Sequence, residues 1–142
     1  MFSKKTQELL EELKSKNIDI NTYLENNTDS LIEINLKNFW DGAIKKSGMS
    51  KSDIINKSDF GYVYFYDVIN GRKIPSSDKI VRLALAMKMT LEQCQTALKY
   101  SGKSPLYPRV KRDSVLIYAI VNNYDIYQTA ELLLKEGLAE LK

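Results

Sequence analysis

The sequence predicts an all-α protein. Its 142 residues include only three prolines and six glycines, the residues that most often interrupt helices. No segment alternates apolar and polar residues between turn pairs, which is the pattern of a half-buried strand. Several segments instead place apolar residues three or four positions apart, as one face of a helix requires. A chain of this length is long enough to bury a real core in one compact domain.

The first 30 residues predict one helix and a connector. Residues 3–16 suit an amphipathic helix surrounded by glutamate and lysine. The apolar face of this helix consists of Leu9, Leu10 and Leu13. Residues 17–30 are rich in Asn, Asp and Thr, which compete with helical hydrogen bonds. We therefore expect a connector there, with one short turn around Tyr23 and Leu24.

The next four helices have recognisable ends. One begins at Leu31 or Asn35 and ends at Ser47, before the C-capping Gly48. The following helices are predicted to begin at capping residues, and Ser50 and Thr90 have the spacing of a capping box with the residue three positions later. The predicted N-caps are Ser50, Ser76 and Thr90. The predicted apolar residues are Leu36, Phe39, Trp40, Ile44, Ile80, Leu83, Ala84 and Met87.

Two more helices follow Gly102 and a pair of prolines. The first, 109–122, is apolar on nearly every side and is therefore predicted to be buried. Asp125 with Gln128 starts the second, by the capping-box spacing. The predicted apolar stripe of that helix consists of Ile126, Ala130, Leu133 and Leu134. We expect residues 103–142 to pack as a helical extension on the core of the preceding helices.

Composition argues against several classes of protein. The chain has no histidine and one cysteine, Cys94, which we expect to be a small buried hydrophobe. Without histidine the chain lacks the usual general base and the commonest metal ligand. With one cysteine it cannot form a disulfide framework or a thiolate zinc site. We predict no enzyme activity, no metal and no cofactor. The single thiol indicates a reducing, cytoplasmic setting, and no apolar run approaches the about 20 residues that cross a bilayer, so we predict no membrane partner.

Charge is distributed unevenly along the chain. Residues 45–112 contain 14 Lys or Arg against 5 Asp or Glu, a net charge of +9, whereas the remainder has 7 against 13, a net of −6. A local excess of this kind attracts polyanions such as nucleic acid. A solvated lysine-rich surface gives the same count.

A spaced set of features lies in residues 48–75, which read GMSKSDIINKSDFGYVYFYDVINGRKIP. Gly-Met-Ser opens a helix, and Asn-Gly-Arg-Lys-Ile-Pro precedes a later one. The apolar positions are Ile54, Phe60, Phe65 and Val68. Within residues 36–98, this segment resembles the helix-turn-helix domain of the phage lambda repressor and Cro-like (XRE-type) family of bacterial DNA-binding proteins. Asp59 occupies the tight turn, where the family usually has glycine, and aspartate reaches the left-handed conformation at modest cost.

The resemblance implies a five-helix domain over 31–102, preceded by residues 1–30 and followed by 103–142. Its third helix would lie in the major groove of DNA. By position, the residues that would face DNA are Ser50, Lys51, Tyr62, Val63, Tyr66, Asp67, Asn70, Arg72 and Lys73. The implied function is a sequence-specific transcriptional regulator that acts as a homodimer on a two-fold operator in double-stranded DNA.

The implied DNA-reading helix has an unusual composition. Its outward positions contain no Arg, Lys or Gln, whose side chains match base edges. Asp67 would approach phosphates with the wrong sign, unless it accepted a hydrogen bond from cytosine N4. Tyr62 and Tyr66 lie one turn apart, and exposed tyrosines are favoured anchors for protein partners. The alternative function is therefore a protein-interaction module that contacts a partner protein through these tyrosines.

Overall fold

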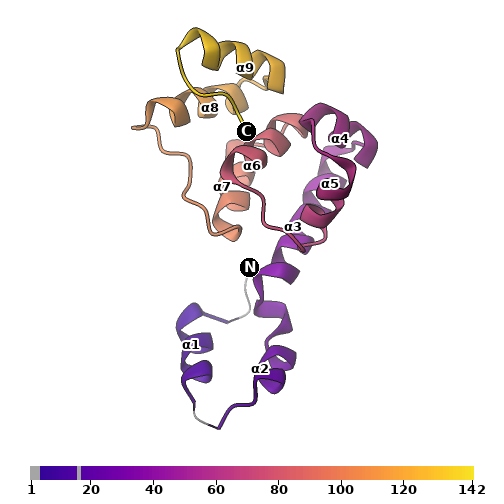
Figure 1. The fold of residues 1–142 in the computed structure, drawn as a ribbon, viewed down its shortest axis with the longest axis vertical. Coiled ribbons are helices and arrows are strands. Elements are labelled where there is room, and N and C mark those ends of the chain that lie inside the picture. The colour runs from indigo at the N-terminus through magenta and orange to yellow at the C-terminus, as the bar shows by residue number, and fades with distance from the viewer. Residues whose placement is uncertain (1–3, 16) are drawn as a thin grey trace.

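The computed structural model describes residues 4–15 and 17–142. All regular secondary structure in this part of the chain is helical, which confirms the all-α class (Figure 1). The helices are α1 (Thr6–Lys14), α2 (Ile20–Asn26), α3 (Ile32–Ser47), α4 (Lys51–Ser58), α5 (Tyr62–Ile69), α6 (Ser77–Ala86), α7 (Leu91–Tyr100), α8 (Lys111–Val121) and α9 (Ile126–Lys135), with a short 3-10 turn at Thr28–Ser30.

Local capping accounts for most helix starts. Ser76 accepts a hydrogen bond from the backbone of Lys79, and Thr90 and Asp125 each form a complete capping box, as predicted. At Ser50 the N-cap bond from the backbone of Asp53 is present, at 3.1 Å, without the reciprocal bond of a box. Aspartate is one carbon shorter than the Glu or Gln that closes a capping box.

Two residues in the left-handed conformation end α3 and α4. Gly48 ends α3 with φ 69°, as expected of a C-capping glycine. Asp59 ends α4 with φ 57° and ψ 38°, so aspartate does take the left-handed conformation at this turn. The left-handed position of the turn between α4 and α5 is therefore occupied by aspartate instead of glycine.

The core is one continuous apolar cluster to which every helix from α3 to α9 contributes. α6 lies at its centre and packs against α4, α7, α8 and α9. The largest fully buried side chains include Trp40 and Leu36 of α3, Phe65 of α5, and Leu116 and Leu133 of α8 and α9. Burial of one such side chain contributes about 1.5–3 kcal/mol. Cys94 is also fully buried, as predicted.

The C-terminal helices are less buried than the sequence predicted. Tyr118 and Val121 of α8 are 53% and 59% exposed, and on α9 Ala130 is exposed and Leu134 is 80% exposed. Both helices lie on the surface and pack against α6 and against each other, and α8 also packs against α7. On α9 that side is taken by Leu133, and Leu134 is rotated away by about 100° at 3.6 residues per turn.

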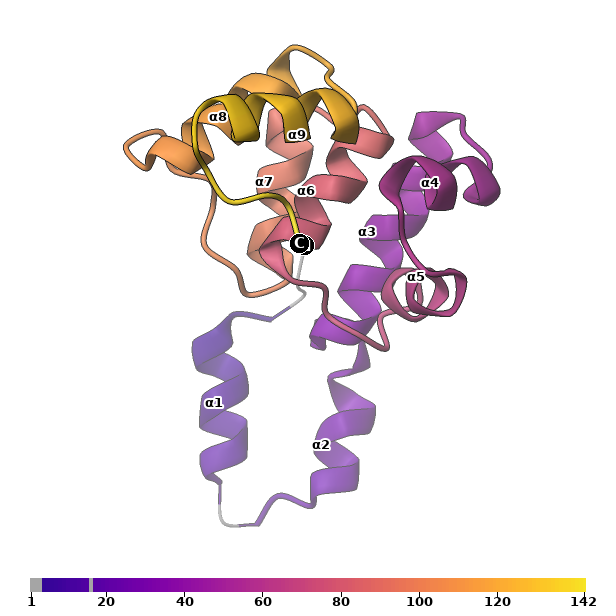
Figure 2. The same cartoon turned by 45° about the horizontal axis from the view of Figure 1, so that its top comes forward.

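The N-terminal helices extend away from this core (Figures 1 and 2). α1 lies within the predicted range 3–16, of which residues 3 and 16 fall outside the described residues. Leu10 and Leu13 on its predicted apolar face are exposed, and α1 has no buried residue. The short turn predicted around Tyr23 and Leu24 lies within α2, a helix of seven residues that occupies more of the connector than predicted. Asp19 accepts a hydrogen bond from the backbone of Thr22 at 3.1 Å, so a residue expected to oppose helix formation starts a helix.

Candidate nucleic-acid interface

The interface is built on α4 and α5, which are joined by the turn 59–61. Phe60 fills this turn. Its ring is buried, lies 6.4 Å from the ring of Phe65 in an edge-to-face arrangement, and lies 5.6 Å from the ring of Tyr64. α4 packs against α6, and α5 packs against α3. The turn therefore has its own apolar anchor, and both helices rest on the core.

An arginine of α6 fixes the same turn. Arg82 donates to the carbonyl oxygen of Ser58 through Nε at 3.0 Å and through Nη2 at 2.8 Å, and it also donates to the carbonyl of Asp59. Its guanidinium lies 5.2 Å from the centroid of the Phe60 ring. The last carbonyls of a helix lack partners within it and attract cations. The sequence analysis did not predict this contact. The position of Arg82 between the apolar residues Val81 and Leu83 was the one indication that its side chain has a partner within the protein.

The first turn of α5 is open to solvent. Tyr62 is 66% exposed and Val63 is 73% exposed. Ser50 and Lys51, at the start of α4, are also exposed, and Lys51 Nζ lies 5.6 Å from the centroid of the Tyr66 ring. The fold thus brings the start of α4 beside the outer side of α5. We call the surface formed by Lys51, Tyr62, Val63 and Tyr66 the α5 face.

The two tyrosines of the α5 face form a pair. Their ring centroids are 4.8 Å apart with an interplanar angle of 50°. A hydrogen bond with Tyr66 raises the pKa of Tyr62, so its phenol stays neutral near pH 7. Tyr66 is half-buried and packs edge-on against Phe65, with centroids 5.6 Å apart. Tyr62 is therefore the outer member of the pair and Tyr66 its support.

Asp67 is turned toward the loop that follows α5. Its side chain is 19% exposed, and its Oδ1 lies 3.4 Å from Arg72 Nη1 while its Oδ2 lies 3.6 Å from Lys73 Nζ. Its carbonyl oxygen accepts hydrogen bonds from the backbone N–H groups of both residues. The acidic group that seemed unsuited to DNA is thus paired with the two cations of the loop.

The remaining residues of the loop are also engaged with the protein. Lys73 Nζ lies 5.6 Å from the Tyr64 ring centroid, and Lys79 Nζ lies 5.2 Å from it. Burial raises the pKa of Tyr64. Asn70 is half-buried at the C-terminal end of α5, where its backbone N–H donates to the carbonyl of Tyr66 at 3.1 Å. Tyr64 was not among the predicted site residues, yet it positions two of the nearby lysines.

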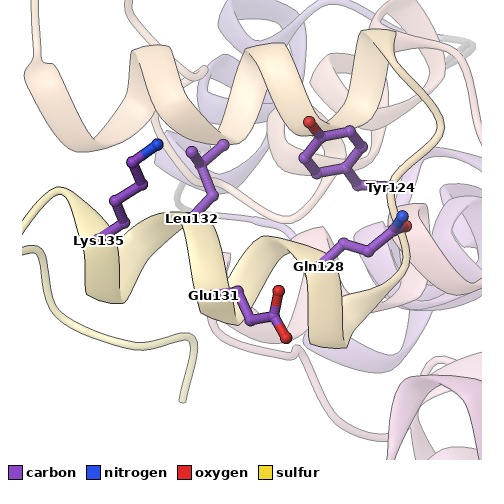
Figure 3. A pocket seen from close by; sticks show the side chains of 5 residues that line it. All are labelled: Tyr124, Gln128, Glu131, Leu132 and Lys135. Carbon is purple, nitrogen blue, oxygen red and sulfur yellow. The ribbon is translucent and has the colours of Figure 1, made fainter.

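A separate hollow of about 280 Å³ lies along α9. Its lining residues are Tyr124, Gln128, Glu131, Leu132 and Lys135, of which Leu132 and Lys135 extend toward the neighbouring helix (Figure 3). Gln128 is already used in the capping box at the start of α9. The lining contains no serine, threonine or cysteine.

Searches of the described residues 4–15 and 17–142 find no cluster of three Cys, Asp or Glu side chains arranged to hold a metal ion. None of the helices in this part of the chain has the length and apolar character needed to cross a membrane.

In comparisons of the whole chain, no protein-family model, curated protein or solved structure gives a significant match.

Proposed function

We propose that this chain is a sequence-specific, DNA-binding transcriptional regulator and that α4 and α5 form a helix-turn-helix of the lambda repressor and Cro-like kind. One observation carries the proposal. The first turn of α5 exposes Tyr62 and Val63, and the cationic Lys51 of α4 lies over the ring of Tyr66, one turn further along α5. In helix-turn-helix proteins the N-terminal residues of the second helix contact base edges while the first helix crosses the backbone.

The surrounding charges support this orientation. Lys51 lies at the start of α4, where it would meet phosphates of one strand. Arg72 and Lys73 lie beyond the other end of α5, and together they exceed the single charge of Asp67 that they contact. Cations at the start of α4 and beyond the C-terminal end of α5 suit a duplex, because phosphate contacts provide affinity and fix the orientation of the protein.

We further propose that the chain binds as a homodimer to a two-fold operator. Helix-turn-helix dimers place two recognition helices about 34–36 Å apart, one turn of B-DNA. An α5 of eight residues, with few exposed polar groups, presents little to one half-site. Two copies would double those contacts. A footprint with two protected half-sites one helical turn apart is the expected result.

The proposal is tested by DNA titration of two lysine variants. Fluorescence anisotropy with a random 25-base-pair duplex, at several salt concentrations, should give an affinity that falls steeply with salt. Lys51→Gln should make the slope of log K against log salt shallower by about one, the value for one lost phosphate contact. Lys111→Gln, an exposed lysine of α8, removes the same charge away from the interface and should leave the slope unchanged.

A second candidate function, a protein-interaction module, is favoured by the exposed Tyr62 and its partner Tyr66. Rigid aromatic side chains are frequent anchors at protein interfaces. The DNA titration separates the two functions. An affinity for DNA that does not change with salt concentration, or a slope that changes equally in Lys51→Gln and Lys111→Gln, would contradict the regulator. If a selection from random oligonucleotides also enriched no sequence, the interaction module would become the better account.

A further inference from the structure

The α5 face offers a duplex an unusual set of chemical groups. Val63 contributes two methyl groups on a side chain that is 73% exposed. Tyr62 contributes an exposed phenol whose ring lies 4.8 Å from that of Tyr66. Lys51 lies over the Tyr66 ring. The first turn of α5 therefore presents an exposed apolar group, the isopropyl of Val63, beside the exposed Tyr62.

Three side chains at or beyond the C-terminal half of α5 could read bases by hydrogen bonding, but they are held away from its first turn. Asp67 could accept from cytosine N4, but both of its carboxylate oxygens face the cations of the loop. Asn70 could pair with adenine, but it lies seven residues beyond Val63, about 10 Å along the helix axis at 1.5 Å per residue. Arg72 is ion-paired with Asp67. None of these groups extends from the exposed first turn.

Only one base presents an apolar group in the major groove. Thymine has a 5-methyl group there, whereas the other three bases offer hydrogen-bond donors and acceptors. An exposed isopropyl group at the start of a recognition helix therefore matches thymine and leaves polar base edges without a partner. A guanine or adenine edge covered by Val63 would lose its hydrogen bonds to water.

We infer that Val63 selects thymine in the bound sequence by contact with its 5-methyl group. This inference rests on the proposed DNA-binding function and assigns the specificity of the same site. Tyr62 and Lys51 then hold α5 against the duplex, and Val63 supplies the choice of base.

The experiment uses DNA that differs only in that methyl group. A random duplex library is amplified with either thymidine or deoxyuridine triphosphate, and sequences enriched from the thymine library are then prepared in both forms. The expected result is weaker binding of the uracil form, by about fourfold for each methyl contacted, the factor that corresponds to about 0.8 kcal/mol for one buried methyl or methylene group.

Two variants assign the effect to Val63. Val63→Ser removes both methyl groups at an exposed position and should abolish the difference between the two DNA forms. Val121→Ser makes the same change at an exposed valine of α8 and should preserve it. Because both variants meet the same uracil-containing duplex, any effect of uracil on duplex shape or stiffness appears equally in each.

The outcomes separate this inference from the function beneath it. Salt-sensitive DNA binding with equal affinity for the two forms would overturn the thymine inference and leave the regulator in place. A thymine preference that persists in Val63→Ser would also overturn it, since another residue would then sense the methyl. Absence of salt-sensitive binding to either form would overturn both the inference and the proposed function.

Discussion

At the scale of single residues, Asp67 controls how much positive charge the α5 side of the molecule presents. Its carboxylate pairs with Arg72 and Lys73, and its carbonyl fixes the backbone of both. Exposed ion pairs of this kind contribute only about 0–1 kcal/mol to folding. The loop is also held by its backbone hydrogen bonds, so the carboxylate can be neutralised without loss of the fold.

Asp67→Asn should strengthen non-specific DNA binding. The change frees the two cations of the loop while keeping the size of the side chain. We expect higher affinity at low salt and a slope of log K against log salt that is steeper by about one. Glu131→Gln on α9 makes the same change in net charge and serves as the control. An unchanged slope, or an equal change in both variants, would show that the loop does not approach DNA.

The sequence predicted part of this surface correctly. The helical spacing of α5 predicts that Phe65 and Val68 point inward, and both are fully buried. It also predicts the exposure of Tyr62. The pairing of Asp67 with Arg72 could not be predicted, because it depends on the path of the loop after α5 rather than on a helical repeat. Helical spacing relates residues three or four apart, and this pair is five apart across a turn.

At the scale of elements, a polar cluster ties the C-terminal segment and α8 to α6. Arg112 of α8 forms two hydrogen bonds with Asp78 of α6, at 3.0 and 2.9 Å, and donates to the carbonyls of Ala139 and Glu140. The backbone N–H of Lys142 also donates to Asp78, at 3.0 Å. Segments distant in the sequence are thus joined at one carboxylate.

The charge of Asp78 should make stability depend on pH. Burial opposes ionisation and would raise its pKa, but the hydrogen bonds from Arg112 and the Lys142 backbone outweigh burial and lower the pKa below the ordinary 3.8. A carboxyl with a depressed pKa in the folded state contributes stability above its unfolded pKa. That contribution is lost as the pH falls through the folded value.

The measurement is urea denaturation of the wild type and Asp78→Asn between pH 7 and pH 2.5. We expect the variant to be less stable at pH 7 and the difference between the two proteins to shrink below about pH 3.8. Arg112→Gln removes the main partner and should reduce the pH dependence in the same direction. A difference that stays constant over this range would show that Asp78 does not act through its charge.

The sequence predicted where helices begin but not which residues of different helices contact one another. Helix starts were predictable because a cap and its partner are three residues apart, as at Thr90 and Asp125. The pairing of Asp78 with Arg112 spans 34 residues, and the contact of Arg82 with Ser58 spans 24. Such pairs depend on how helices pack, and no local spacing encodes them.

At the scale of the whole molecule, the central helices and the C-terminal pair share one core. Leu116 and Leu133 belong to the same buried cluster as Trp40 of α3, and α8 and α9 both pack against α6. A cluster that is continuous across these elements implies cooperative unfolding. The N-terminal pair is different, because α1 contributes no buried residue and the buried Tyr23 of α2 is not part of this cluster.

Two adjacent leucines test whether this core unfolds as a unit. Leu133 is fully buried, whereas Leu134 is 80% exposed. Leu133→Ala should destabilise the protein by about 2–5 kcal/mol, and Leu134→Ala, with the same chemical change, should stay within about 0.5 kcal/mol of the wild type. The probe is the fluorescence of Trp40, the single tryptophan, which is buried in α3.

Because Trp40 lies in a different part of the sequence from α9, its unfolding transition reports whether damage at Leu133 reaches the central helices. If the core is shared, the urea midpoint of the Trp40 transition falls by an amount that corresponds to the full loss of stability, and the circular dichroism of α3 to α9 shifts with it. If α8 and α9 were instead an independent appendage, Leu133→Ala would lower the helical signal in an early separate step and leave the Trp40 transition in place. Coincident shifts are the result that the continuous cluster requires.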